Sequence, residues 1–554
     1  MNYIGITVGP IIYTLSYSST PAGLWFASYF FSNLVKELCS KLNEKNYIIL
    51  TLPENHDFNK DDHGIGTYHD RIYFKSDKNA DEIHQEWDAI LSTVLGKISK
   101  DMEAALKEAP QSSELFNASK IEQFLKDYLQ IHFAVLSEEK VSAKGIARSL
   151  ADVLDVLELA NKVHAEQKDN PLLKLIRGDK DSSNQYLKNY KKLADTASDT
   201  KFPLAEKHAD STIEIRSIGD ICNGNGIGDF KIKGKMRKYF AVVQCDGDSM
   251  GKTIASDDEL GNLGQQEKRI QAFSKMCMNY TESASELVRA YGGVVIYAGG
   301  DDLLFLAPVL STKNNEAANV WELCKKIGEM FNGIVKDANP TKKPSLSFGV
   351  AIHYHKYPLY EAFNHAIGML FGVAKDFNAE RKNNLAMQLY KHSGQTTEFV
   401  CCMETNDGMS KECRLYDEFT GFLRMVCGKG DELPTDKEEH EKNMFMHSVL
   451  YQLENQKSLF QQALLRDDNQ MLKNLFNNTF DHPDQNFGQK MINEVISIVE
   501  KAKIACQNEE KLARGCEKAI ASSNNKNQAC KDAEQTMAVV NAMLRTSKFL
   551  VEEE

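Results

Sequence analysis

One stretch of the sequence decides how the rest is interpreted, and it runs Tyr291-Gly-Gly-Val-Val-Ile-Tyr-Ala-Gly-Gly-Asp-Asp-Leu-Leu-Phe-Leu-Ala-Pro308. Two short runs of β-branched, aromatic and aliphatic residues flank a Gly-Gly-Asp-Asp turn, which is the pattern of a β-hairpin. Glycine permits positive φ and lets another backbone or a phosphate come close, so Gly299 and Gly300 are candidate ligand-contact residues. The adjacent carboxylates of Asp301 and Asp302 repel each other, and a divalent metal is the usual relief.

A second acidic pair follows an apolar strand upstream. Residues 239–245 are almost entirely apolar, and the next four are Asp246-Gly247-Asp248-Ser249. The i, i+2 spacing of the two aspartates places both carboxylates on one face. Three or four oxygen ligands from two neighbouring strand ends suit Mg²⁺ or Mn²⁺, with nucleotide phosphates completing the coordination shell. We therefore predict four metal ligands, Asp246, Asp248, Asp301 and Asp302, and two further nucleotide contacts, Gly247 and Ser249.

Either motif alone has an ordinary explanation, because Gly-Gly-Asp-Asp also occurs in polar hairpins and Asp246 and Asp248 could begin a solvated loop. Together, separated by one long helical segment, they match the metal site of a nucleotide polymerase or cyclase palm. We therefore treat Asp246, Asp301 and Asp302 as candidate catalytic carboxylates of a metal-dependent site. The spacing leaves open whether Asp248 and Asp302 bind metal directly.

Length and composition restrict the class of protein. At 554 residues the chain is too long for one hydrophobic core, and its 42% hydrophobic content is that of a soluble globular protein. No apolar run reaches membrane-spanning length and the start lacks signal-peptide features, so we expect a cytoplasmic protein. The formal net charge of -12 argues against a protein that coats nucleic acid by itself, although the basic run from Lys231 to Lys238 could assist.

The predicted elements occur twice in the order β-α-β-β-α-β, which is the ferredoxin-like arrangement. The first set has strands at 3–8, 47–52, 71–75 and 129–136, and helices at 22–42 and 82–106. The second set has strands at 239–245, 293–298, 303–308 and 345–353, then a helix at 359–375 and a strand at 385–390. After residue 412 the patterns are helical, at 417–426, 440–463, 467–477, 486–505, 509–521 and 529–552.

We therefore predict an α+β protein with two ferredoxin-like, palm-like domains, helical insertions and an all-α C-terminal domain. The predicted boundaries are 1–168 for the first palm, 169–235 for a helical or linker region, 236–411 for the second palm and 412–554 for the helical domain. Domains with their own cores tolerate separation at polar linkers. Removal of the helical domain is thus expected to cost partner assembly before it costs the fold of the palm.

The loop between the second and third predicted strands is rich in histidine and aspartate. Its His69-Asp70 pair resembles the dipeptide of metal phosphohydrolases. Such enzymes need further His and Asp residues on surrounding helices, whereas this pair lies inside a ferredoxin-like unit. We expect a polar surface loop.

With these residues in hand, the chain resembles the large, polymerase-like subunit of type III CRISPR effector complexes. The shared features are two palms, the two acidic motifs in this order, a helical C-terminus, and an opening with Gly9-Pro10 and Leu24-Trp25. Ala374-Lys375 and Arg381-Lys382-Asn383 are similar to the family's basic positions after the turn. The resemblance implies that Lys375 contacts the triphosphate of ATP and that Lys382 belongs to the same nucleotide-binding set.

Two departures from the family pattern carry expectations of their own. The chain starts directly at the first palm, so it resembles the branch without an HD nuclease domain, and we expect no cleavage of single-stranded DNA by this subunit. Many members carry a four-cysteine zinc module before the second palm, but only Cys222 stands there in this chain. The twelve cysteines form no paired CxxC pattern, so neither zinc nor a disulfide framework is expected.

The resemblance implies a role in antiviral defence. Target RNA bound to the assembled complex would switch on nucleotidyl transfer from ATP, with guide and target RNA held mainly through partner subunits. The product would be a nucleotide second messenger, either a cyclic oligoadenylate or a conjugate of AMP with S-adenosylmethionine. Two alternatives stay open: a catalytically silent scaffold subunit of the RNA-guided complex, and a free-standing GGDEF-like nucleotide cyclase.

Overall fold

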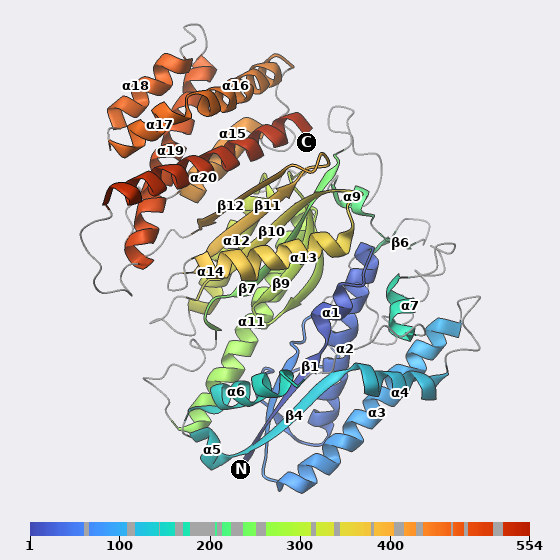
Figure 1. The fold of residues 1–554 in the computed structure, drawn as a ribbon. Helices are drawn as coiled ribbons and strands as arrows, with labels where there is room; N and C mark the ends of the chain where they lie inside the picture. The colour runs from blue at the N-terminus through green and yellow to red at the C-terminus, as the bar shows by residue number, and fades with distance from the viewer. Residues whose placement is uncertain are drawn as a thin grey trace.

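The computed structural model contains two large β-sheets and a helical region (Figure 1). A small two-stranded sheet is formed by β5 (Ala205–Lys207) and β6 (Ile213–Ile215). The residues that the structure describes are 1–59, 66–107, 117–142, 144–160, 170–177, 205–207, 213–215, 217–222, 237–250, 262–311, 317–336, 344–377, 382–403, 415–427, 436–466, 469–480, 486–513 and 525–553. None of the helices within these ranges is long and apolar enough to cross a membrane. Most of the predicted region 169–235, including residues 231–236 of the basic run, lies outside the described residues.

The first sheet is four-stranded and antiparallel, in the order β2-β3-β1-β4. Its strands are β1 (Asn2–Gly9), β2 (Ile48–Ile49), β3 (Arg71–Ser76) and β4 (Gln130–Ser137). The helices that connect and cover it are α2 (Pro21–Glu44), α3 (Ala80–Lys107), α4 (Ala118–Tyr128), α5 (Glu138–Ser142) and α6 (Ile146–Glu158). The ferredoxin-like order is confirmed, but the predicted strand 47–52 is reduced to two residues and α4 was not predicted.

The second sheet is six-stranded, in the order β12-β11-β10-β7-β9-β8. Four of its strands repeat the ferredoxin-like order: β7 (Tyr239–Gly247), β8 (Val294–Gly299), β9 (Asp302–Pro308) and β10 (Leu346–Tyr354). β11 (Asn384–Tyr390) adds in parallel to β10, and β12 (Thr396–Cys402), which was not predicted, pairs antiparallel with β11. The helices of this palm are α11 (Leu263–Tyr291), α12 (Val320–Lys336) and α13 (Leu359–Met369).

The central strand β7 is buried on both faces, which explains its continuous apolar sequence. Tyr239, Ala241 and Val243 face a core that includes Trp321 of α12. The alternate residues of β7 face a different core, which also contains side chains of the first palm. Burial on both faces fixes the register, and therefore the place where the chain leaves the sheet at Asp246.

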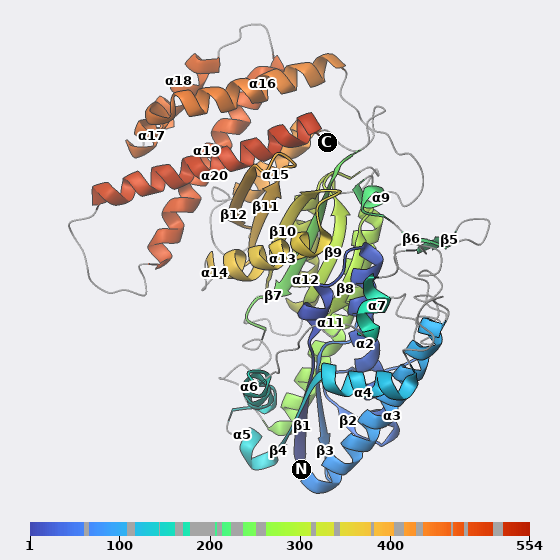
Figure 2. The same ribbon diagram turned by 45° about the vertical axis from the view of Figure 1, so that its right-hand side comes forward.

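Helix α2 is the element that joins the two palms. Most of its side chains are buried, including Leu24, Trp25 and Phe31, so the helix is apolar nearly all round. It packs against strands of the first sheet and also against β8 of the second (Figure 2). Ala362 and Phe363 of α13 complete the same core. The two palms therefore share one apolar interior.

The C-terminal region is helical, as predicted. Its helices are α15 (Leu415–Cys427), α16 (Asp436–Asn455), α17 (Lys457–Leu465), α18 (Asn469–Phe480), α19 (Asn486–Ala513) and α20 (Asn525–Glu553). The single helix predicted at 440–463 is wrong, because the chain breaks it at Gln456. The start of the helix predicted at 509–521 is instead the end of α19, and residues 514–524 lie outside the described residues.

The helical region does not have a separate core. Phe419 of α15 contacts the rings of Trp321 in α12 and Phe399 in β12. Glu322 of α12 binds the guanidinium of Arg424, and Lys325 pairs with Asp417 at 2.5 Å. Buried residues of the helical region and the second palm form one cluster. The shared cluster weighs against the expectation that removal costs partner assembly before it costs the fold of the palm. That expectation and the domain boundaries stay predictions.

Candidate active site at the end of the second palm sheet

The predicted Gly-Gly-Asp-Asp turn connects β8 and β9, with Gly299 opposite Asp302. A β-bulge at Ile296 shifts the register of β8 just before the turn, and such bulges commonly re-aim side chains next to sites. Gly300 has φ +66°, in the left-handed region that favours glycine. A Cβ on Gly299 would lie 2.3 Å from the hydroxyl oxygen of Tyr297, so this position also requires glycine.

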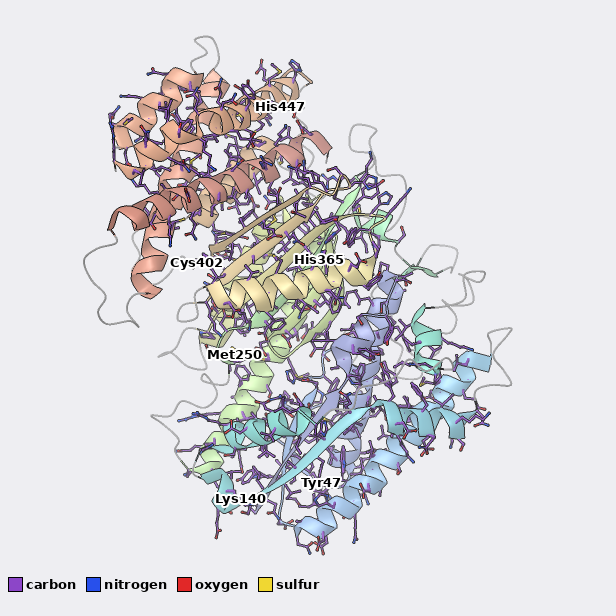
Figure 3. The ribbon with its side chains drawn as sticks, in the orientation of Figure 1. Tyr47, Lys140, Met250, His365, Cys402 and His447 are labelled. Carbon is purple, nitrogen blue, oxygen red and sulfur yellow. The ribbon has the colours of Figure 1, made fainter. Side chains whose placement is uncertain are left out.

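The end of β7 meets this turn. The amide of Gly247 donates a hydrogen bond to Oδ2 of Asp301 at 3.1 Å. A Cβ on Gly247 would lie 2.2 Å from the same oxygen, so glycine is what permits the approach. The last paired residues are Cys245 and Leu303, which places Asp246 and Asp302 one step further along their strands. In Figure 3, Met250 marks this end of β7 on the side facing the first palm.

The two turn carboxylates are crowded. Burial raises the pKa of Asp301, and the nearby imidazole of His69 offsets part of that rise. Burial and then the charge of Asp301 raise the pKa of Asp302 well above its ordinary value. A bound cation would lower both values, because it stabilises the ionised carboxylates.

Lys375 reaches the site from the helix that follows β10. Its ammonium group forms an ion pair with Asp246 and donates a hydrogen bond to the carbonyl oxygen of Gly247 at 2.9 Å. The five residues before it, Leu370–Ala374, form a π-helical segment, labelled here η2. Burial and then the ammonium of Lys382 lower the pKa of Lys375 to about 8. The two predicted phosphate-binding lysines are thus close to each other, and Lys375 also contacts Asp246.

Asp248 lies on the other side of β7, toward β10. Its carboxylate accepts hydrogen bonds from Oγ of Ser345 at 2.7 Å, from Oγ of Ser347 at 2.8 Å and from the amide of Asn383 at 2.9 Å. Burial raises its pKa, and these hydrogen bonds offset part of the rise. The structure therefore places the end of β7 at Asp246 next to the turn of Asp301 and Asp302, but it engages the oxygens of Asp248 elsewhere.

Two of the predicted contact residues have unusual backbone conformations. Ser249 is exposed with φ 57°, and Lys382 has φ 53°. Asn383, which follows Lys382, has φ 56°. Non-glycine residues in this region are strained by roughly 1–2 kcal/mol each, so their surroundings must hold them there. The hydrogen bond from Asn383 to Asp248 is one such restraint.

The first palm also reaches this site, through residues that the sequence analysis assigned to a surface loop. The side chains of His69 and Asp70 are partly exposed, at 37% and 35%, as expected of a surface loop. His69 also lies against Gly300, because a Cβ on Gly300 would be 2.9 Å from Cδ2 of the imidazole. Nδ1 of His69 is 2.8 Å from Oδ1 of Asp70. Burial alone would lower the pKa of His69, but Asp70 and then Asp301 hold it above its ordinary value. No sequence signal links His69 to a turn 231 residues away.

The donor set suits a hard divalent metal. Carboxylates of Asp246, Asp301 and Asp302 are oxygen ligands of the kind that Mg²⁺ and Mn²⁺ prefer, and the Lys375 ammonium already occupies Asp246 as a stand-in cation. Within the described ranges, no three His, Cys, Asp or Glu side chains are already gathered around one point. Metal binding would therefore require Lys375 to leave Asp246.

Residues 239–386, which hold all of these strand ends, match the family described as Cas10/Cmr2, second palm domain. The second palm is therefore similar to the second palm domain of Cas10/Cmr2 proteins. The CRISPR system Cmr subunit Cmr2 of Pyrococcus furiosus is 32% identical over 205 residues, which are 33% of this chain and 21% of that protein. The match thus spans about a fifth of the length of that Cmr2 relative, and the resemblance to type III large subunits is confirmed.

One solved structure with a TM-score above 0.5 supports the fold. The type III-B Cmr-beta apo structure, determined by cryo-EM, has a TM-score of 0.53 at 13% identity and covers 86% of this chain and 77% of that chain. A Csm1-Csm4 cassette in complex with AMPPNP has a TM-score of 0.43 at 13% identity and covers 90% of this chain and 69% of that chain. The α+β class with two palms and a helical region is confirmed, while the roles of individual site residues stay predictions.

Proposed function

We propose that this chain is a nucleotidyltransferase that uses ATP to make a nucleotide second messenger within a type III CRISPR effector complex. The observation that carries the proposal is that the Asp301–Asp302 turn meets the end of β7, where Lys375 pairs with Asp246, in a palm similar to that of Cas10/Cmr2 proteins. The name of the Pyrococcus furiosus relative, a Cmr subunit of a CRISPR system, supports assembly with partner subunits. Binding of guide and target RNA through those partners is part of the proposal.

The residues of the site divide into three roles in this proposal. Asp246, Asp301 and Asp302 would hold Mg²⁺ or Mn²⁺, which when bound lowers the pKa of an attacking hydroxyl and neutralises charge on the pyrophosphate. Lys375 and Lys382 would bind the triphosphate of ATP. Gly247, Ser249, Gly299 and Gly300 would leave room for nucleotide near the backbone.

Lys375 would have two alternative binding partners in this proposal. In the structure its ammonium neutralises Asp246. With Asp246 as a metal ligand, the same ammonium would be available to pair with the negative charge of a triphosphate. In the transfer step an acceptor hydroxyl oxygen bonds to the α-phosphorus of ATP, the bond to pyrophosphate breaks, and the hydroxyl proton leaves to solvent.

Asp248 has a positioning role in this proposal. Its hydrogen bonds from Ser345, Ser347 and Asn383 connect the end of β7 to β10 and to the segment that carries Lys382. A carboxylate with these partners fixes the distance between the end of β7, which carries Asp246, and the segment that carries Lys382.

The test is mass spectrometry of the products formed from ATP by the chain assembled with its partner subunits and target RNA, with and without S-adenosylmethionine. Combined Asp301→Ala and Asp302→Ala substitutions should lower product by a factor of about 10³ or more, because several kcal/mol of charge stabilisation is lost. Asp88→Ala with Asp127→Ala, on exposed positions of α3 and α4, is the matched control. Full product from the first double variant would contradict the proposal.

One observation favours the silent scaffold alternative, namely that Lys375 occupies Asp246 and no three ligands are gathered among the described residues. Calorimetric titration of the wild-type chain with Mn²⁺ separates the two functions. Binding that is lost on Asp301→Ala supports the transferase. Absence of Mn²⁺ binding together with intact complex assembly supports the scaffold.

A further inference from the structure

A short segment of the first palm, Gly66–Asp70, docks on the edge strand of the second palm. The amide of Ala298 in β8 donates a hydrogen bond to the carbonyl oxygen of Gly66 at 3.0 Å. A Cβ on Gly66 would lie 3.3 Å from the ring of Tyr297, and the amide of Tyr68 donates to Oγ of Ser32 in α2 at 3.0 Å. The segment is therefore anchored to both palms immediately before His69.

The imidazole of His69 is held on one side and contacts the turn with the other. Nδ1 lies 2.8 Å from Oδ1 of Asp70 and 3.1 Å from the amide nitrogen of Arg71. Cδ2, on the opposite side of Cγ, faces Gly300, whose missing side chain makes the space for it. Arg71 is in turn paired with Asp155 of α6 at 2.5 Å.

The turn needs such a contact. Two consecutive glycines have more backbone freedom than any other pair of residues, so their own sequence does not confine them. Gly300 precedes Asp301, and a change in its φ would move that carboxylate relative to the Gly247 amide. A displacement of about 1 Å in a reacting group costs about 100-fold in rate.

We propose that His69 of the first palm is a positioning residue that holds the Gly299–Asp301 turn of the second palm in its productive conformation. This inference rests on the proposed nucleotidyl transfer at Asp301. Both palms would then contribute to the active site, because the His69 ring of the first palm fills the space beside Gly300 of the second palm.

The experiment compares His69→Ala, His69→Asn and His69→Phe in the full chain, assembled and supplied with ATP, Mg²⁺ and target RNA. His69→Ala and His69→Asn both remove the ring edge at Gly300 and should lower kcat by about 10- to 100-fold with a much smaller change in KM for ATP. His69→Phe keeps a ring at this position and should recover most of kcat. His84→Ala, on an exposed position of α3, should match the wild type.

A second measurement does not depend on activity. Amide hydrogen exchange of a peptide spanning residues 297–303 should be faster in His69→Ala than in the wild type and restored in His69→Phe, with an unchanged thermal midpoint. Unchanged exchange, or equal loss of kcat in all three variants, would overturn the positioning role. A wild-type chain that makes no product would contradict the proposed function, whereas the exchange result would still decide the role of His69.

Discussion

At the scale of single residues, His353 shows how strongly burial controls charge in this molecule. Its side chain is fully buried at the end of β10 opposite the candidate site, stacked on Tyr357 with ring centres 4.3 Å apart. Nε2 lies 3.2 Å from Nδ1 of His365, and Nδ1 has no hydrogen-bond partner among the described residues. Burial and then His365 lower the pKa of His353 to about 3. The folded protein therefore holds this imidazole neutral.

This difference in pKa predicts a pH dependence of stability. In the unfolded chain His353 takes up a proton below about pH 6.5, whereas in the folded chain it does so only near pH 3. The folded state thus loses stability as pH falls through this interval, by about 3 kcal/mol at pH 4.5. His353→Phe should flatten the dependence when denaturant unfolding is measured at pH 7.5 and 4.5. His392→Phe, at an exposed position, is the control, and parallel pH profiles for both variants would contradict the argument.

The glycines of the site show which part of it the sequence could predict. The sequence correctly indicates that Gly247, Gly299 and Gly300 each permit a close approach. It does not indicate the neighbours, which are Asp301, Tyr297 and His69. A glycine in the sequence indicates that its own backbone needs space or positive φ. Which side chain fills that space depends on packing between segments that are distant in the sequence.

The same limit applies to Asp248. Its spacing from Asp246 predicts a shared face, but its hydrogen-bond donors Ser345, Ser347 and Asn383 come from 97 to 135 residues further along the chain. Side-chain alternation along a strand cannot reveal which neighbouring strand supplies a donor. For this reason the sequence predicts which carboxylates belong to the site, but it does not distinguish the role of Asp248 from that of Asp246.

At the scale of elements, the close packing of α13 on β10 sets the position of Lys375. A Cβ on Gly349 of β10 would lie 2.2 Å from the carbonyl oxygen of Ala366 and 2.4 Å from the amide nitrogen of Leu370. The backbone of α13 therefore rests directly on the strand where the π-helical segment begins. This contact fixes where the following turn directs Lys375.

Gly349→Ala tests this contact. The added methyl group must push α13 away from β10, which should lower the free energy of unfolding by about 1–3 kcal/mol or more and disturb nucleotide binding through Lys375. Gly368→Ala is a matched control on the same helix, because nothing lies within 4 Å of its Cβ position. That control should raise stability by roughly 0.5–1 kcal/mol, since alanine favours helix over glycine. Equal stability of the two variants, by thermal unfolding, would refute the packing argument.

Elements with a clear pattern of apolar residues were predicted well, and elements with a weak pattern were missed. β7 to β10 are buried on both faces, so their apolar runs are long and clear. β12 begins with Thr396-Thr397-Glu398, its exposed and buried positions alternate, and only a few apolar residues indicate a strand there. The break between α16 and α17 at Gln456 has neither glycine nor proline to mark it.

At the scale of the whole molecule, α15 is part of the second palm's interior. Phe419 is fully buried between Trp321 and Phe399. Phe419→Ala should therefore lower the free energy of unfolding by about 3–5 kcal/mol, the cost of a large cavity in a core. It should also lower the thermal midpoint of the palm and the helical region together. Leu459→Ala, at a position 44% exposed on α17, should change little.

Separate transitions for the palm and the helical region would contradict a shared core. Unfolding of the palm is best followed by exchange of amide hydrogens in β7 and β10, and unfolding of the helical region by exchange in α16 and α19. If Phe419→Ala loosens only the helical region, the palm has enough contacts to fold without α15. The sequence could not predict this coupling, because amphipathic helices do not specify which surface they cover.

The placement of α2 between the two sheets also has a consequence during synthesis on the ribosome. Its apolar surface is completed by residues as late as Ala362 and Phe363, about 320 residues after the helix has been made. At roughly 5–20 residues per second, translation of that interval takes roughly 15–65 s. During this time α2 of the newly synthesised first palm is incompletely covered and can associate with other chains. We therefore expect chaperones to bind the first palm at this stage.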